Sequence, residues 1–235
     1  MKLIKNLLPI YLILLGLFVG TAFAGSRVVT VAAESASIVR QHVFVIDPGH
    51  GGIDGGATSC TGVLESQLNL EISLRLNELM HLLGYETCMI RTTDESVYTQ
   101  GETIAAKKVS DLKHRVQMVN EAENAVLISL HQNQFSDSRY SGAQVFYAKD
   151  EESRKLAQQL QSAFLQTINP DSHRKIKKAE GIYLLEHIQS PGILIECGFL
   201  SNPREEAALR SDAYQKKMCT VIACVLSTHF GSELS

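Results

Sequence analysis

The sequence lacks the cysteine spacing that holds zinc in small structural motifs. Its five cysteines are an odd number, and no two form a Cys-x-x-Cys pair: Cys60, Cys88, Cys197, Cys219 and Cys224. A zinc knuckle is therefore excluded. Cys88, Cys219 and Cys224 lie among apolar neighbours and are predicted to be reduced core residues, because a free cysteine behaves as a small hydrophobe. Cys197 follows Glu196, whose carboxylate would raise the thiol pKa, and this argues against a nucleophile.

The chain also lacks an excess of positive charge and a nucleotide-binding loop. Its formal net charge of −3 at pH 7 gives no general reason to expect nucleic acid as a partner. Residues 47–56 contain five glycines but not the Gly-Lys-Ser/Thr ending that holds a nucleotide. Glycine reaches dihedral angles closed to other residues, so this loop is expected to turn tightly around the imidazole of His50.

The first 24 residues differ in character from the rest of the chain. Lys2 and Lys5 precede an apolar stretch that ends in Thr21-Ala-Phe-Ala24, the layout of a secretory signal cleaved after Ala24. The stretch is nearly long enough to span a bilayer, so an uncleaved membrane anchor is the alternative. The cleavage site contains no cysteine, which argues against a lipoprotein. We therefore expect an exported protein, at the cell wall or the outer face of the membrane, with residues 25–40 as a tether.

The remaining residues, 41–235, fit one α/β domain with ample hydrophobic content for a core. Three apolar runs without alternation end near a polar residue with catalytic potential: His50, His131 and Glu196. Such runs are typical of strands buried on both faces of a largely parallel sheet. Ligands bind outside the carboxyl ends of the strands in these sheets. We therefore expect the three side chains to lie at one edge of a mostly parallel mixed sheet flanked by helices on both faces.

Other elements follow from the spacing of apolar residues. Helices are predicted over residues 65–83, 151–168 and 212–230. Short strands are predicted over residues 85–90, 143–147 and 182–185. Residues 92–110 show neither period and are expected to form a long loop, after which Asp111 opens a helix buried through Leu112, Val116 and Val119. No internal repeat and no separate wall-binding domain are expected.

Two imidazoles and a carboxylate could form a catalytic metal site. His50, His131 and Glu65, which begins the first helix, match the usual zinc set with one position open to water. Taken singly, Glu65 suits any helix N-terminus and His131 could simply bond to backbone. In combination they predict one Zn²⁺ that activates water, with Glu196 as the general base. Asp47 is expected to orient His50 rather than bind the metal.

Four segments resemble the zinc-dependent N-acetylmuramoyl-L-alanine amidases of the type 3 class. They are Val45-Ile-Asp-Pro-Gly-His-Gly-Gly52, Glu65 at a helix start, Leu127-Ile-Ser-Leu-His-Gln-Asn133 and Ile193-Leu-Ile-Glu-Cys-Gly-Phe-Leu-Ser-Asn-Pro203. The resemblance spans residues 41–230 and implies that His50, Glu65 and His131 bind zinc while Glu196 is the catalytic glutamate. It implies cleavage of the amide that joins N-acetylmuramic acid to L-alanine in peptidoglycan. Gln132 and Cys197 depart from the commoner pattern and leave substrate preference open.

With its N-terminal signal, compact size and lack of wall-binding repeats, the chain most resembles the members of this family that act in spore cortex synthesis. The resemblance thus implies a step toward muramic-δ-lactam that is needed for germination, in the space between the forespore and mother-cell membranes. Asn133 and Arg115 are candidates to steady the oxyanion. The basic run over residues 174–178 either receives carboxylates of the stem peptide or is a solvated loop. A helper protein is expected to recruit or activate the enzyme on its insoluble glycan.

Two other classes of function stay open at this point. One is a different zinc hydrolase of peptidoglycan, a carboxypeptidase or deacetylase that uses the same histidine and glutamate set. The other is a non-enzymatic wall-binding protein built on an inactive scaffold. Its expected signature is loss of a zinc ligand or of Glu196, and the sequence retains all four residues.

Overall fold

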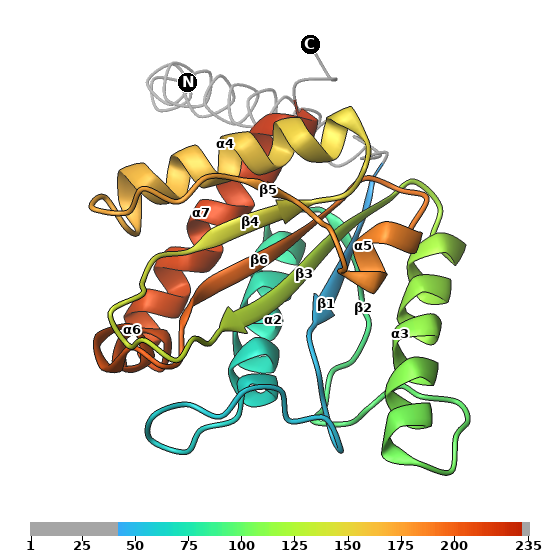
Figure 1. Ribbon diagram of the computed structural model, residues 1–235. Helices are drawn as coiled ribbons and strands as arrows, with labels where there is room; N and C mark the ends of the chain where they lie inside the picture. Colours follow the sequence, from blue (N-terminus) through green and yellow to red (C-terminus); the bar gives the residue numbers. More distant parts are fainter. Residues whose placement is uncertain (1–41, 232–235) are drawn as a thin grey trace, which may run out of the picture. The chain divides into compact units, whose positions relative to one another are not determined.

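The computed structural model describes residues 42–231. The predicted signal or anchor over residues 1–24 and the tether over residues 25–40 lie outside this range. A six-stranded sheet separates two layers of helices (Figure 1). Among residues 42–231, no helix is both long and apolar enough to cross a membrane.

The sheet is mixed and mostly parallel, as predicted. Its spatial order is β2-β1-β3-β6-β4-β5, and β4 pairs antiparallel with β6 while the other pairs are parallel. The strands are β1 Val43–Pro48, β2 Glu86–Met89, β3 Ala125–Asn133, β4 Gln144–Tyr147, β5 Lys177–Lys178 and β6 Gly192–Phe199. The three long runs found in the sequence are thus the adjacent central strands β1, β3 and β6.

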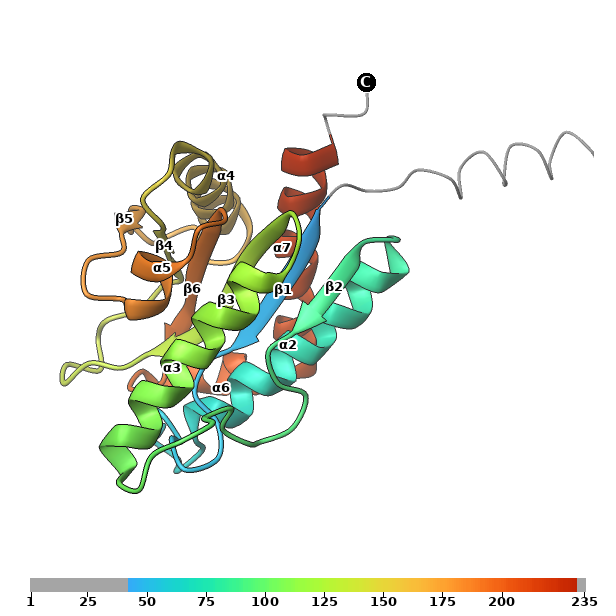
Figure 2. The same cartoon turned by 90° about the vertical axis from the view of Figure 1, so that its right-hand side faces the viewer.

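Helices cover both faces of the sheet, which confirms the predicted architecture (Figure 2). On one face lie α2 Glu65–Leu82, α4 Glu151–Thr167 and α7 Asp212–Gly231. On the other face lie α3 Ile104–Glu121 and α5 Tyr183–His187. A further short helix, α6 Pro203–Leu209, follows β6. The first three helices begin at the predicted residues and end within one residue of the predicted bounds.

The central strands are buried on both faces, which explains their lack of alternation. Phe44, Ile128 and Ile193 pack toward α2, α4 and α7. Val45 and Leu127 belong to the smaller cluster beneath α3 and α5. Each buried aliphatic or aromatic side chain contributes about 1.5–3 kcal/mol to folding. Successive strand residues therefore face two separate hydrophobic layers rather than one layer and water.

The helix α3 begins earlier than the sequence predicted. We expected a loop up to Ser110, but the helix starts at Ile104, and the side chain of its N-cap, Thr103, accepts a hydrogen bond from the Ala106 amide. Alanine and lysine, good helix formers, fill its first turns. Its buried residues are Ser110, Arg115 and Val119. The prediction missed the start because two of these three residues are polar. Of the expected stripe, Val119 is buried and Val116 packs partly buried against the core, but Leu112 is exposed and its assignment is wrong.

Two smaller predictions are also wrong. Of the strand predicted over residues 182–185, Ile182 is the N-cap of the short helix α5 and residues 183–185 belong to that helix. The extra strand β5 lies in the basic run, where Lys177 and Lys178 pair with Phe146 and Tyr147. Such a two-residue pairing depends on a neighbour distant in sequence, so local periodicity cannot reveal it.

All five cysteines are free. Cys219 is buried and Cys88 half-buried, as predicted, but Cys224 is exposed, and its assignment to the core is wrong. Cys197 is fully buried. Burial, with a further contribution from the charge of Glu196, raises the thiol pKa of Cys197 above its usual range, which agrees with the argument against a nucleophile.

Candidate metal and catalytic site

The strand register gathers the polar side chains at one edge of the sheet. His131 on β3 pairs with Glu196 on β6, and Glu196 pairs in turn with Gln144 on β4. Side chains two residues apart on a strand share a face. His131 therefore lies on the same face as Leu127, and Glu196 on the same face as Leu194, the face covered by α3 and α5.

The loop after β1 holds His50 in an unusual backbone conformation. His50 has a φ of 60°, in the left-handed region. A Cβ on Gly49 would collide with the imidazole of His131. A Cβ on Gly56 would lie 2.6 Å from Oε2 of Glu65 and 2.7 Å from Cδ2 of His50. Glycine is needed at both positions because the backbone passes directly against the side chains of the site.

Three of the four key side chains present a compact set of donor atoms. Nε2 of His50 lies 3.3 Å from Oε2 of Glu65, and Nδ1 of His131 lies 3.0 Å from Oε1 of the same carboxylate. One donor atom from each of the three residues falls within 4.8 Å of the others. Ligand atoms about 2.1 Å from a tetrahedral ion lie roughly 3.4 Å apart. The residue types and spacing therefore fit a zinc-sized cation.

Glu65 is held in place by backbone as well as by the imidazoles. It is 4% exposed, and its carboxylate accepts hydrogen bonds from the amides of Ala57 at 2.9 Å and Gln132 at 3.1 Å. Burial alone would raise its pKa, but hydrogen bonds and charges from His131 and His50 hold the pKa well below its usual range. Glu65 is therefore ionised at neutral pH, as a metal ligand must be.

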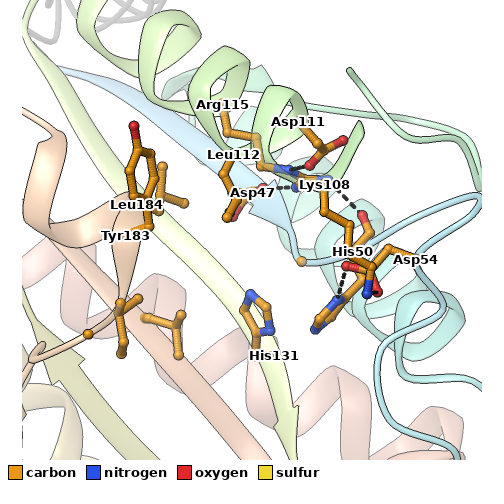
Figure 3. Close-up of a pocket in the computed structure, with 14 residues that line it drawn as sticks. Asp47, His50, Asp54, Lys108, Asp111, Leu112, Arg115, His131, Tyr183 and Leu184 are labelled. Atoms are coloured by element: carbon orange, nitrogen blue, oxygen red, sulfur yellow. Dashed lines mark hydrogen bonds and ion pairs between the residues drawn. The ribbon is translucent and has the colours of Figure 1, made fainter. Parts of the chain in front are cut away.

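Asp54 and Lys108 form a second row behind His50 (Figure 3). Nδ1 of His50 lies 2.9 Å from Oδ2 of Asp54, and Nζ of Lys108 lies 2.8 Å from the other oxygen of that carboxylate. Burial lowers the pKa of His50, but Glu65 and Asp54 outweigh it and raise that pKa to about 9. Sequence analysis missed both residues. A carboxylate four positions after His50 was the available signal for Asp54, whereas Lys108 lay in the presumed loop.

Glu196 differs electrostatically from Glu65. Its Oε2 is buried and has no hydrogen-bond partner among residues 42–231. Burial raises the pKa of Glu196 to about 7, although the charges of His131, His50 and Arg174 oppose the rise. A carboxyl group with a pKa near the working pH can both accept and return a proton. This is the behaviour expected of an acid–base residue rather than of a metal ligand.

Asp47 and Arg115 bond to each other, and Asp47 does not contact the His50 ring. Asp47 accepts hydrogen bonds from Arg115 and, at 2.6 Å, from the hydroxyl of Ser129, whereas the His50 ring is held by Asp54. Arg115 is 2% exposed and also donates to Asp111 at 2.5 Å and to the His50 carbonyl at 2.7 Å. Its guanidinium is thus committed to holding the loop. Arg115 also lines the cavity beside His50 and His131, and an oxyanion contact by it stays a prediction.

The remaining residues predicted to contact substrate are Asn133 and the basic run over residues 174–178, and they lie in different places around the site. A cavity of about 260 Å³ borders His50 and His131 and is lined further by Lys108, Tyr183 and Leu184 (Figure 3). Asn133 lies outside its lining, after an irregularity in the β3 and β6 pairing. A direct substrate contact by Asn133 stays a prediction. On the opposite side, beyond Glu196, lies Arg174 of the basic run.

A family profile described as N-acetylmuramoyl-L-alanine amidase matches residues 44–227, nearly the whole of the described chain. The chain belongs to this family. The amidase is 36% identical over 182 residues to the germination-specific N-acetylmuramoyl-L-alanine amidase of Bacillus subtilis (strain 168), with 77% of this chain and 76% of the relative covered. It is 25% identical over 234 residues to AmiA of Escherichia coli (strain K12), covering 81% and 76%.

Solved structures place the fold of this amidase in the same family. The CwlD amidase from Clostridioides difficile, solved in complex with the GerS lipoprotein, matches with a TM-score of 0.77 and 34% identity, over 81% of this chain and 98% of that one. An N-acetylmuramoyl-L-alanine amidase from Clostridium difficile 630 matches with a TM-score of 0.71 and 29% identity, over 83% and 99%. The protein is therefore an enzyme whose substrate is peptidoglycan.

Proposed function

We propose that the amidase uses one zinc ion, held by His50, Glu65 and His131, to hydrolyse the bond between N-acetylmuramic acid and L-alanine. The main support is the donor set, in which one ligand atom of each residue lies within 4.8 Å of the others. When bound, zinc supplies Lewis acidity that polarises the scissile carbonyl and activates a water molecule. Asp54 would keep His50 oriented toward the ion through the hydrogen bond to Nδ1.

Glu196 is the proposed acid–base residue of this reaction. Its carboxylate accepts a proton from the attacking water as the new C–O bond forms at the lactyl carbonyl. It then returns that proton to the L-alanine nitrogen as the C–N bond breaks, so that a carboxylic acid and a free amine leave. The unpartnered Oε2 and the pKa near 7 support this role. Proton transfer by a positioned group contributes about 10²–10⁴ to the rate.

We further propose that this amidase acts in spore cortex maturation. Similarity to the germination-specific amidase of Bacillus subtilis supports the role. Removal of stem peptides from the glycan would provide the muramic acid needed for muramic-δ-lactam, and so prepare the cortex for germination. The proposal includes export through residues 1–24, either as a cleaved signal or as a membrane anchor. The enzyme would then work between the forespore and mother-cell membranes.

A helper protein is the proposed partner at this location. Support comes from the CwlD amidase, which was solved together with the GerS lipoprotein. A partner of this kind would recruit the amidase to its polymer, activate it or help it retain zinc. Equal rates on isolated peptidoglycan with and without a lysate of the native host would count against the helper.

Mass spectrometry of digested peptidoglycan tests the reaction itself. Full-length protein would be incubated with purified peptidoglycan, once loaded with zinc and once treated with a chelator. We expect zinc-dependent release of intact stem peptides that begin with a free L-alanine amine, with the glycan uncut. Shortened peptides would instead indicate a carboxypeptidase, deacetylated sugars a deacetylase, and peptide release unaffected by the chelator would overturn the role of zinc.

A further inference from the structure

Arg174 lies beside Glu196 on the side away from the His50 cavity, and the proposed mechanism does not use it. Gln144 on β4 is the direct antiparallel partner of Glu196. Directly opposed residues of an antiparallel pair project to the same face, and neighbouring strands are about 4.8 Å apart. Nη1 of Arg174 donates to Oε1 of Gln144 at 3.0 Å. The guanidinium is therefore placed about one strand beyond the proposed acid–base residue.

Neutral groups fix the orientation of this guanidinium. Its Nε donates to the carbonyl of Ser141 at 2.7 Å, and its Cζ lies 4.4 Å from the centre of the Phe199 ring. Phe199 is 3% exposed, and its ring stacks in turn on Tyr140 at 6.2 Å. A planar arginine held by two acceptors and a buried ring loses little further entropy when it binds a ligand.

Arg174 is not held in an ion pair by any carboxylate of the described residues. Within residues 42–231 it forms no ion pair, and its Nη2 group has no protein acceptor, although the side chain is only half-buried. Burial lowers its pKa, while the charges of Glu205 and Glu196 oppose that change from a distance. Arg115, in contrast, bonds to two aspartates. Arg174 thus presents unused donors in a fork suited to an incoming carboxylate.

The lysines of the same basic run lack this arrangement. Lys175, Lys177 and Lys178 are exposed. Lys177 lies 5.8 Å from the centre of the Phe146 ring, at the sheet edge. The basic run therefore divides into three solvated lysines and one arginine that is fixed beside the site.

We propose that Arg174 binds a carboxylate of the stem peptide and so selects the acidic form of the substrate. The proposal rests on the amidase reaction proposed above. The second stem residue, D-glutamate joined through its side chain, carries an α-carboxylate that is free in some peptidoglycans and amidated in others. Two residues of extended chain reach about 7 Å. This length is enough to cross the spacing of one strand, from Glu196 to Arg174, which is hydrogen-bonded to Gln144 on the neighbouring strand.

Two soluble muramyl peptides that differ only in this carboxylate, one free and one amidated, test the proposal. Full-length zinc-loaded enzyme should favour the free acid by about 10- to 100-fold in kcat/KM, since a hydrogen bond to a charged group contributes roughly 1.5–3 kcal/mol. The Arg174→Gln enzyme should cut the two peptides at equal rates, and that rate should match the rate of the wild type on the amidated peptide. Arg174→Lys should retain part of the preference, because it keeps the charge but loses the fork.

Lys175→Gln is the matched control, since it removes one exposed charge from the adjacent position and should keep the wild-type ratio. A loss of folding or of zinc lowers both rates equally, so the ratio separates selection from a structural role. Equal wild-type rates on the two peptides, or an unchanged ratio in Arg174→Gln, would overturn the assignment and leave the amidase reaction standing. Failure of the wild type to cut either peptide would instead remove the proposed reaction and this site with it.

Discussion

At the scale of single residues, the site contains two glutamates whose pKa values move in opposite directions. Glu65 contacts both imidazoles, which hold its pKa well below the usual range despite burial. Glu196 has a buried oxygen that finds no hydrogen-bond partner in the described part of the chain, and burial raises its pKa to about 7. Pairs of carboxyl groups that are separated in this way usually divide the ionised and the proton-carrying roles between them. The local environment, rather than the residue type, therefore distinguishes ligand from acid–base group.

Replacing Glu196 by glutamine tests this division of roles. The amide keeps the shape of the side chain but cannot accept a proton from water, so turnover should fall by about 10²–10⁴ while bound zinc is retained. Stem-peptide release and metal content per chain would be measured together. Glu123→Gln, a change at an exposed site before β3, should leave both unchanged. A fully active Glu196→Gln enzyme would disprove the assigned role.

Asp54 is predicted to support metal binding through His50. Asp54→Asn weakens the contact that fixes the imidazole, and loss of such outer partners typically lowers metal affinity about 10- to 100-fold. Competition with a chelator of known affinity would measure the change. Asp137→Asn, which alters an exposed ion pair with Arg139, serves as the control. Equal zinc affinity in wild type and Asp54→Asn would refute the positioning role.

At the scale of elements, side chains of α3 hold the loop that contains His50 in place. Arg115 projects from this helix to Asp47 at the end of β1 and to the carbonyl of His50. Lys108, two turns earlier, reaches Asp54. The polar buried face of α3 is therefore explained by its position over the site. The same polarity hid the start of the helix from a search for apolar periodicity.

Asp47→Asn is predicted to destabilise the fold by weakening the contact between Arg115 of α3 and the end of β1. Removing one partner of a buried ion pair costs about 3–5 kcal/mol when the remaining charge is left uncompensated. Arg115 keeps its ion pair with Asp111, so the cost here should fall below that range. Arg115 and Ser129 overcome burial and hold the pKa of Asp47 below its usual value. Ionised Asp47 thus stabilises the fold above an unfolded pKa of about 3.9, and the benefit is lost as the pH falls through the folded pKa.

Urea unfolding of wild type and Asp47→Asn at pH 7 and at several pH values below 4 measures this effect. We expect a large difference in the free energy of unfolding at pH 7 that shrinks as the pH falls. Glu121→Gln, at an exposed position on the same helix, controls for loss of one negative charge. A difference that is independent of pH would mean that Asp47 acts through packing and not through its charge.

At the scale of the whole molecule, metal binding should be visible in stability. His50, Glu65 and His131 come from a loop, α2 and β3, so an ion that binds all three links separate parts of the fold. A ligand that binds only the native state stabilises by about 2.7 kcal/mol at a concentration 100 times its Kd. The melting temperature should therefore rise with zinc concentration and fall with chelator.

The matching control for this titration is a triple variant that carries His50→Ala, Glu65→Gln and His131→Ala. Its melting temperature should not respond to micromolar zinc, whatever its absolute stability. An equal response in the variant and the wild type would place the bound zinc elsewhere on the chain. No response in the wild type would contradict the zinc site itself.

The sequence by itself determined the central sheet, the three long helices on one face and the residues that meet at the strand ends. These features depend on local periodicity and on the rule that parallel strands end at a common edge. The sequence could indicate the four key residues because Glu65 begins a helix, His50 follows the end of β1, and His131 and Glu196 lie near the carboxyl ends of β3 and β6.

Only the tertiary structure decided which polar groups meet across the fold. In the structure, Asp54 and not Asp47 bonds to the His50 ring. Arg115 holds the loop through the His50 carbonyl. Arg174 bonds to the strand partner of Glu196, unlike the neighbouring lysines. The His50–Asp54 contact is local, but the contacts of Arg115 and Arg174 join residues from different segments of the fold, up to 68 positions apart for Asp47 and Arg115. Hydrogen bonds and ion pairs of this range depend on how the elements pack, and no local pattern in the sequence records them.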